Sequence, residues 1–448
     1  MEEVLLEREE ERTVRGCYCD FTAEARRLGY LAGPMVGVTL SQYLVQVTSS
    51  MIVGHLGELA LSSSAIATSL SGVTGFSVLL GMASGLDTLC GQAYGAKQYK
   101  KLGIHTYRAI LSLVLVCLPI SLIWVSMGKL LSLIGQDPLI SQEAGIYAVW
   151  MIPGLFAFAI AQPLMKFLQS QSLILPMLLS SFVTLCVHIP LCWVMVFKTG
   201  LGNVGAALSI SISYWINVLI LALYIKYSDS CNATRAPLSM EALRGINEFL
   251  RLAIPSAVMI CLTSISLLYT IPYGLGCAAS TRVSNELGAG NPEQAHLAVR
   301  VATSITITEA VLVSLTLFTL RRLVGHAYSD EKEVVDYVRE MTPLVSISVI
   351  SDGCLGVLSG IARGCGWQHL GAYVNLGAFY LVGIPTAVLL GFFLHIGGKG
   401  LWIGILSGAV IQSLLLGIIT TFTNWQQQAM VARERAFGER LPLQSVLK

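Results

Sequence analysis

Three carboxyl side chains interrupt long apolar stretches of this sequence, at Asp87, Glu309 and Asp352. An ionised carboxylate is costly at membrane depth, and such residues usually face a cavity where they bind ions or relay protons. At helical spacing from Asp352 the residues are small or polar, as at Ser348 and Gly356, so this face meets other helices or a cavity and not lipid. Burial favours the protonated form of a carboxyl, and Asp352 could therefore take up and release a proton.

Each of these carboxyls also has a structural interpretation. Asp352 could be hydrogen-bonded to a neighbouring helix for packing alone, and Glu309 lies on a mixed face. Asp87 lies near the end of its apolar stretch, where it could be solvated or paired with Lys97. With these alternatives open, we predict proton coupling at Asp352, Glu309 and Asp87.

Uncharged polar side chains form a second set of candidates. Amides and phenols in apolar helices can hydrogen-bond an organic ligand or stack against it, although each can equally serve helix packing. We predict that the substrate-binding residues are Gln42, Gln46, Tyr214, Asn217, Asn375 and Tyr380.

Sequence motifs for several other chemistries are absent. There is no GxxxxGK[ST], HExxH or GxSxG, which excludes a self-contained ATP-driven pump and argues against an enzyme. The pair Cys17 and Cys19 and the seven histidines lack metal-ligand spacing, so we expect no metal and no cofactor. A net charge of +2 without clustered Lys and Arg argues against nucleic-acid binding.

The candidate residues must be positioned by helices that cross a membrane. Of 448 residues, 54% are hydrophobic and 12% are charged, about half the charge of an ordinary soluble domain. The chain is built from apolar blocks of about 20 residues, the length that crosses about 30 Å of hydrocarbon. We predict an all-α polytopic membrane protein with eleven spans, over residues 28–53, 64–92, 104–127, 143–166, 172–197, 203–226, 250–281, 295–320, 339–362, 370–394 and 399–423.

The two halves of the sequence repeat each other. AYGAKQYKKLG (93–103) matches ELGAGNPEQAH (286–296) at an offset of 193, whereas LAGP (31–34) matches LAIP (252–255) at an offset of 221. From the difference between these offsets, the second copy lacks about 28 residues between Pro255 and Gly288. We predict two pseudo-repeated lobes of six helices, the second shortened to about five, with a substrate cavity between them.

The predicted organisation has five parts: an N-terminal tail (1–27), an N-lobe (28–226), a linker (227–249), a C-lobe (250–425) and a C-terminal tail (426–448). Lys and Arg alternate between sides in the first half, so the positive-inside rule places the N-terminus and the linker in the cytosol. If residues 254–276 form one continuous helix, the spans that follow either reverse their orientation or depend on a re-entrant segment.

The sequence resembles the plant-type, DETOXIFICATION-like branch of the multidrug and toxic compound extrusion (MATE) family. Five motifs carry the resemblance: GHLGELALSSSAIATS (54–69), TLCGQAYGAKQY (88–99), RVSNELGAGNP (282–292), LSGIARGCGWQ (358–368) and NLGAFYLVGIP (375–385). The resemblance implies two six-helix lobes, a V-shaped cavity and exchange of organic compounds or toxins for protons. It matches Asp352 with the family's acidic residue of the tenth helix. It matches Gln42 and Gln46 with polar residues of the first helix, and Asn375 and Tyr380 with those of the eleventh.

One departure from the family pattern coincides with the shortened repeat. After Leu262 the family continues with a Glu-Trp-Trp-Ser-Phe-Glu stretch, a short loop and most of an eighth helix, all absent from this sequence. The leading interpretation is a secondary active antiporter, and the alternative is a truncated, transport-incompetent form of one. We expect a monomer in the plasma or vacuolar membrane whose partners are small organic substrates, protons and the lipid bilayer.

Overall fold

A computed structural model describes residues 2–237, 245–261, 269–321, 323 and 332–438. Within these residues the chain forms helices and the turns that connect them, without a strand. The predicted all-α class is therefore confirmed.

The first half of the chain forms the N-lobe, a bundle of antiparallel helices. Asp137 caps the start of the helix over Pro138–Ser170, because the Asp137 Oδ1 atom accepts hydrogen bonds from the backbone N–H groups of Leu139 (2.9 Å) and Ile140 (3.2 Å). The elements are α1 (Glu2–Gly54), α2 (Glu58–Ser71), η1 (Gly72–Phe76), α3 (Ser77–Ala83), α4 (Gly85–Gly95), α5 (Tyr99–Val125), α6 (Met127–Leu133), α7 (Pro138–Ser170), α8 (Ile174–Trp193), η2 (Val194–Lys198), α9 (Gly202–Tyr227) and η3 (Asp229–Cys231).

The second half forms the C-lobe and a short terminal helix. Gly290 has a φ of 82°, a left-handed conformation that ends α12 and that side chains other than glycine rarely adopt. The elements are α11 (Ile246–Cys261), α12 (Thr270–Ala289), α13 (Pro292–Thr319), α15 (Lys332–Cys365), α16 (Gln368–Leu376), η4 (Gly377–Gly383), α17 (Ile384–Val388), η5 (Leu389–Phe393), α18 (Gly398–Thr421) and α19 (Trp425–Phe437).

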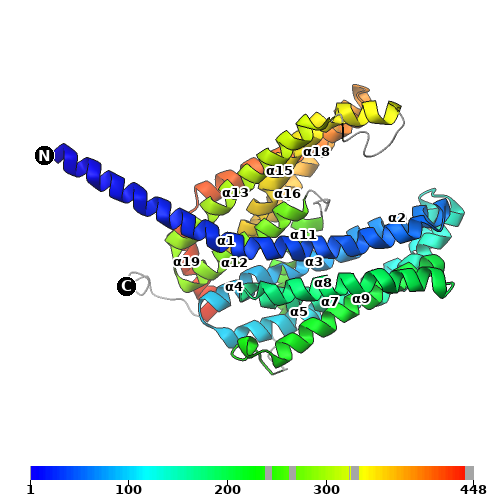
Figure 1. The fold of residues 1–448 in the computed structure, drawn as a ribbon, viewed down its shortest axis with the longest axis horizontal. Coiled ribbons are helices and arrows are strands. Elements are labelled where there is room, and N and C mark those ends of the chain that lie inside the picture. The colour runs from blue at the N-terminus through cyan, green and yellow to red at the C-terminus, as the bar shows by residue number, and fades with distance from the viewer. Residues whose placement is uncertain (1, 238–244, 262–268, 322, 324–331, 439–448) are drawn as a thin grey trace.

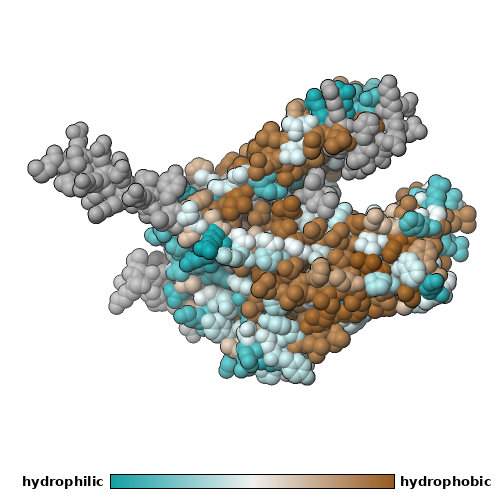
Figure 2. All heavy atoms as spheres, in the orientation of Figure 1, coloured by the Kyte–Doolittle hydropathy of each residue, from teal (hydrophilic) through white to brown (hydrophobic). Residues whose placement is uncertain are grey.

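The two lobes form a V that is closed at one end. In Figure 1 the lobes separate toward the right and meet at the left, where α4, α12 and α19 are labelled. We call the closed end the basic end, because Lys101, Arg433 and Arg435 lie there. Lys101 Nζ donates to the Ala436 carbonyl (2.6 Å), which ties α5 to α19 at this end. Apolar side chains cover the middle of both lobes, and hydrophilic ones gather toward the ends (Figure 2), as expected for a bundle surrounded by lipid.

Ten of the eleven predicted spans are confirmed. Each coincides with one of ten helical segments that are long and apolar enough to cross a membrane among the described residues. The N-lobe holds six of these segments, with α2, η1, α3 and α4 forming a single one, and the C-lobe holds four. The predicted spans that contain π-helical turns, such as 370–394, are still single continuous helical segments.

The single span predicted over 250–281 is replaced by two helices, α11 and α12. Helix α11 begins near the basic end, where Glu248 Oε2 lies 3.1 Å from Arg108 Nη1, and α12 ends there with Gly290 beside Arg433. The 16 residues of α11 extend about 24 Å, less than the about 30 Å of a hydrocarbon layer. The described residues form two helices, the first beginning and the second ending at the basic end, and we call α11 and α12 the re-entrant pair. The stretch 262–268 of the predicted span lies outside the described residues.

A reciprocal helix contact joins the two repeats at the basic end. A Cβ atom at Gly95 would overlap the Asn285 carbonyl oxygen, and one at Gly288 would overlap the Gln92 carbonyl oxygen. Gly95 and Gly288 are separated by 193 residues, and so are Gln92 and Asn285. The contact thus relates equivalent positions of α4 and α12 by a pseudo-two-fold axis, which is the structural form of the sequence repeat.

We expect both ends of the chain to lie on the same side of the membrane. Epitope tags at the N-terminus, after Asn232 and after Phe437 should be equally accessible from that side, because ten spans and a re-entrant pair return the chain to where it started. Tags at Gly135 and Gly397 should be accessible only from the other side. A C-terminal tag opposite the N-terminal one would show that α11 and α12 cross the membrane as one span.

Candidate functional site

The lobes are joined by a buried cluster of charged residues, which we call the seam cluster and which contains Asp87 on α4, Lys166 on α7 and Arg363 on α15. Lys166 Nζ lies 2.9 Å from Asp87 Oδ1, and Arg363 Nε lies 3.2 Å from Asp87 Oδ2. The three side chains are 2%, 4% and 2% exposed, respectively. Lys166 belongs to the same lobe as Asp87, whereas Arg363 comes from the other lobe, so Asp87 links the two halves.

Polar side chains from both lobes surround this cluster. Gln169 Nε2 donates to Thr281 Oγ1 (3.0 Å) and to the Cys277 carbonyl (3.2 Å), both on α12. Thr88 donates to the Arg363 carbonyl. Hydrogen bonds between the two lobes therefore surround the ion pairs of the seam cluster.

Two more hydrogen bonds follow the pseudo-two-fold axis. Gln92 Nε2 donates to the Gly364 carbonyl (3.2 Å), and Asn285 Nδ2 donates to the Ser170 carbonyl (3.0 Å). Gln92 and Asn285 are equivalent in the repeat, and the two acceptors lie at the ends of α15 and α7. Each lobe thus holds the other through the same type of contact.

The seam cluster holds two cations and one anion, and this imbalance makes Asp87 indispensable. A buried pair whose partner is removed is destabilised by about 3–5 kcal/mol, because an uncompensated charge remains. The suggested pairing of Asp87 with Lys97 is therefore corrected to Lys166 and Arg363. Sequence reasoning missed both cations. Lys166 is the last residue of the predicted span 143–166 and Arg363 follows the predicted span 339–362, so in sequence each resembles an ordinary residue at a span end.

Asp352 and Glu309 lie elsewhere, beside the contact between α13 and α15. A Cβ atom at Gly353 would lie 3.1 Å from the Ala310 Cβ, so the two carboxyl residues are neighbours of one helix crossing. Both side chains are half-buried. Among the described residues, the Glu309 Oε2 atom is buried without a hydrogen-bond partner, and Asp352 takes part in none of the ion pairs found there.

Tyr269, which directly precedes α12, and Tyr273 on α12 lie near Arg363 of the seam cluster. The rings of Tyr269 and Tyr273 are 6.2 Å apart. The Arg363 guanidinium carbon lies 6.0 Å from the Tyr273 ring centre. Tyr269 is within electrostatic range of both Asp352 and Arg363. Neither tyrosine was singled out in the sequence, because their importance depends on where the re-entrant pair places α12.

Four of the predicted substrate-binding residues gather in the N-lobe. Gln42, Tyr214 and Asn217 line a cavity of about 20 Å³, room for about one water molecule, and Gln46 lies beside Tyr214. The Asn217 Oδ1 atom is buried there without a hydrogen-bond partner among the described residues. Polar groups are thus available on the N-lobe side, with no carboxylate among the residues that line the cavity.

The two remaining predicted residues lie in the C-lobe, apart from this cavity. Asn375 is fully buried, and its Nδ2 donates to the Met259 carbonyl (2.9 Å), which fastens α16 to α11. Tyr380 is 55% exposed in the π-helical segment η4. The structure therefore does not bring the six predicted residues into one group.

Two lobes of spanning helices, related by a pseudo-two-fold axis and joined at one end of a V, define a membrane transporter of the two-repeat type. A family model described as MatE matches residues 34–194 and again residues 255–389. The chain belongs to this family, the MATE transporters. Its two matches start 221 residues apart and end 195 residues apart, which confirms the repeat and its shortened second copy.

Individual relatives are similar over nearly the whole chain. Protein DETOXIFICATION 12 of Arabidopsis thaliana is 52% identical over 93% of this chain and 92% of the relative. Protein DETOXIFICATION 14 of the same plant is 53% identical over 94% and 92%. A crystal structure of the eukaryotic MATE transporter AtDTX14 superposes with a TM-score of 0.90 and 53% identity, over 93% of this chain and all of that one. A single-residue mutant of the Vibrio cholerae MATE transporter VcmN has a TM-score of 0.79 at 17% identity over 94% of this chain and all of its own, which shows the shared fold alone.

The comparisons place the missing residues inside the chain. The alignment with DETOXIFICATION 12 has 444 positions, whereas 93% of 448 residues is about 417, so about 27 positions have no counterpart in this chain. Because 92% of the relative is covered, a truncated form is not supported. What distinguishes this chain from these relatives is an internal shortening, which the repeat offsets bracket between Pro255 and Gly288.

We expect Asp87→Asn to destabilise the protein by about 3–5 kcal/mol, since it leaves Lys166 and Arg363 buried without a counter-charge. Arg363→Met should cost less, because a neutral Asp87–Lys166 pair remains. The measurement is thermal unfolding of the purified protein in detergent. Glu340→Gln, which breaks the exposed Glu340–Lys399 pair, is the control and should have little effect. Equal effects of all three changes would contradict a structural role for the seam cluster.

Proposed function

We propose that this chain is a secondary active antiporter that exports organic compounds in exchange for protons, with Asp352 as the carboxyl that carries the proton. The observation that supports Asp352 is its difference from Asp87. Both oxygens of Asp87 are held by cations, whereas Asp352 is half-buried and free of the ion pairs formed among the described residues. A carboxyl that alternates between charged and neutral forms needs this freedom.

The driving force is sufficient for such a carrier. One pH unit supplies about 1.4 kcal/mol per proton, and a potential of 100 mV adds about 2.3 kcal/mol per charge. A proton that neutralises Asp352 removes a negative charge from the C-lobe. Tyr269, near Asp352, also lies near Arg363. We infer that this loss of charge changes the electrostatic field at the seam cluster. The ion pairs of the seam cluster must break if the lobes are to separate at the basic end.

The substrate would enter the V between the lobes. The amides and phenols of Gln42, Gln46, Tyr214 and Asn217 offer hydrogen bonds without net charge, which suits amphipathic organic molecules of varied structure. The basic end would face the cytosol, in keeping with the positive-inside tendency. The plasma or vacuolar membrane, and a monomeric state, stay predictions.

Asp352→Asn should abolish substrate accumulation driven by a pH gradient and leave substrate exchange at equal pH intact, because only the first process requires a proton on this side chain. The assay is uptake of ethidium, a planar organic cation, into proteoliposomes, with and without the gradient. Asp336→Asn is a matched control, since Asp336 is an exposed carboxyl of the same helix.

Two results would contradict this proposal. If Asp352→Asn retained gradient-driven accumulation, the proton would be carried elsewhere, and Glu309→Gln would be tested next. If the unmodified protein moved ethidium in neither assay while DETOXIFICATION 14 did so in both, the shortened re-entrant pair would have removed transport itself.

A further inference from the structure

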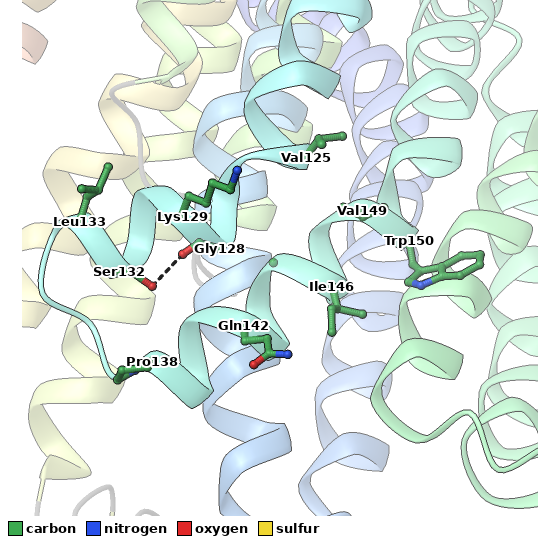
Figure 3. A pocket seen from close by; sticks show the side chains of 11 residues that line it. Val125, Gly128, Lys129, Ser132, Leu133, Pro138, Gln142, Ile146, Val149 and Trp150 are labelled. Carbon is green, nitrogen blue, oxygen red and sulfur yellow. Dashed lines mark hydrogen bonds between the residues drawn. The ribbon is translucent and has the colours of Figure 1, made fainter.

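An open groove lies on the outside of the N-lobe, far from the seam cluster. It has a volume of about 900 Å³ and lies between the end of α5, the short helix α6 and the first half of α7. Figure 3 shows Lys129 and Ser132 on α6, and Gln142, Ile146 and Trp150 on α7. Since α5 starts at the basic end and finishes at Val125, this groove lies at the opposite end of the spans.

The groove is created by a close helix crossing at its floor. A Cβ atom at Gly145 would lie 2.9 Å from the Gly128 Cα, and one at Gly128 would lie 3.0 Å from the Ser141 carbonyl oxygen. Glycines let α6 approach α7 here, and the larger side chains on either side then form walls. The hollow is therefore part of the packing of α6 against α7.

Lys129 is the one charged side chain among the residues that line this groove. In Figure 3 it extends from α6 toward Val125 at the end of α5. Among the described residues it is found in no ion pair. Asp137, in the turn between α6 and α7, accepts the backbone N–H groups of Leu139 and Ile140 at its Oδ1 atom and forms no ion pair with Lys129 among the described residues.

The apolar wall of the groove matches an acyl chain. Ile146, Val149 and Trp150 follow each other on one face of α7 and are 37%, 38% and 44% exposed. A tryptophan with its ring partly exposed near a span end is typical of the membrane interface. An ammonium group that forms no ion pair among the described residues, beside an apolar wall, is complementary to a molecule with an anionic head and a hydrocarbon tail.

We propose that this groove binds one membrane phospholipid, with the phosphate at Lys129 and an acyl chain along Ile146, Val149 and Trp150. Gln142 is a further polar side chain that lines the groove and could donate to the phosphate. Such a lipid fills a hollow at the crossing of α6 and α7 and fixes the end of α5 relative to α7. This site is independent of the proposed transport activity.

The first test is native mass spectrometry of the purified protein with added phosphatidylglycerol. Lys129→Gln should lower the retention of one lipid molecule about fivefold, the effect of about one lysine near an anionic lipid. Lys198→Gln is the matched control. It also removes a lysine that lies beside a tryptophan, with Lys198 Nζ 5.3 Å from the Trp193 ring centre, and it should leave retention unchanged. Equal retention by the two variants would overturn the proposal.

A second test addresses the acyl chain without changing charge. Val149→Trp fills the wall of the groove and should displace the lipid. In vesicles of brominated phospholipid, the unmodified protein should lose more tryptophan fluorescence than Trp150→Phe does, because Trp150 lies against the chain. Retention that survives Val149→Trp, or quenching that is the same in Trp150→Phe, would refute the position of the tail.

The source of the phosphate is distinguished by competition. Inorganic phosphate at the same concentration should not displace the lipid, because it lacks the tail. Displacement by inorganic phosphate would make this an ion site, and a doubled mass in place of the lipid adduct would make it an interface between two copies. Either result would overturn the lipid assignment.

Discussion

The Asp87 carboxylate, held between a lysine of its own lobe and an arginine of the other, is the interaction on which the arrangement of the lobes depends. In a low-dielectric interior an ion pair is strong only if its charges stay together, so Asp87 fixes where α4, α7 and α15 meet. Around it, the glycines of α4 and α12 allow backbone contact between the repeats. The lobes are held together at the basic end and diverge toward the other end, and this arrangement gives the molecule its V shape.

The shortened second repeat is tolerated because it leaves this junction intact. About 27 positions of the relatives are missing, yet the described part of α11 still packs on α3 through Gly81 and Ala257, and α12 still packs on α4. Both ends of the re-entrant pair stay at the basic end. The spans that follow therefore keep their direction, and Arg363 of α15 reaches Asp87 in the seam cluster.

The sequence was sufficient to predict helices, repeats and the place of the shortening. Apolar length predicted ten spans, and the spacing of Gly95 and Gly288 predicted a repeat that the structure expresses as a pseudo-two-fold contact.

Charge pairing could not be predicted, because the partners of Asp87 are 79 and 276 residues away in sequence. The prediction of one span over 250–281 was wrong for a related reason. Hydropathy measures the length of an apolar stretch, and it does not show whether the chain reverses its direction within that stretch. Asn375 is a further example, since an amide that binds a ligand and one that fastens two helices look alike in sequence.

The link between Asp87 and Arg363 holds the lobes together at the basic end. It is tested most directly by the distance between spin labels at Glu58 and Gly397, which lie on different lobes at the open end, in a cysteine-free background. We predict one long distance in the unmodified protein and an added shorter distance in Arg363→Met, which cuts the link between lobes. Lys166→Met, which removes only the partner within the N-lobe, should keep the long distance. The same distance distribution in Arg363→Met and in the unmodified protein would contradict this account.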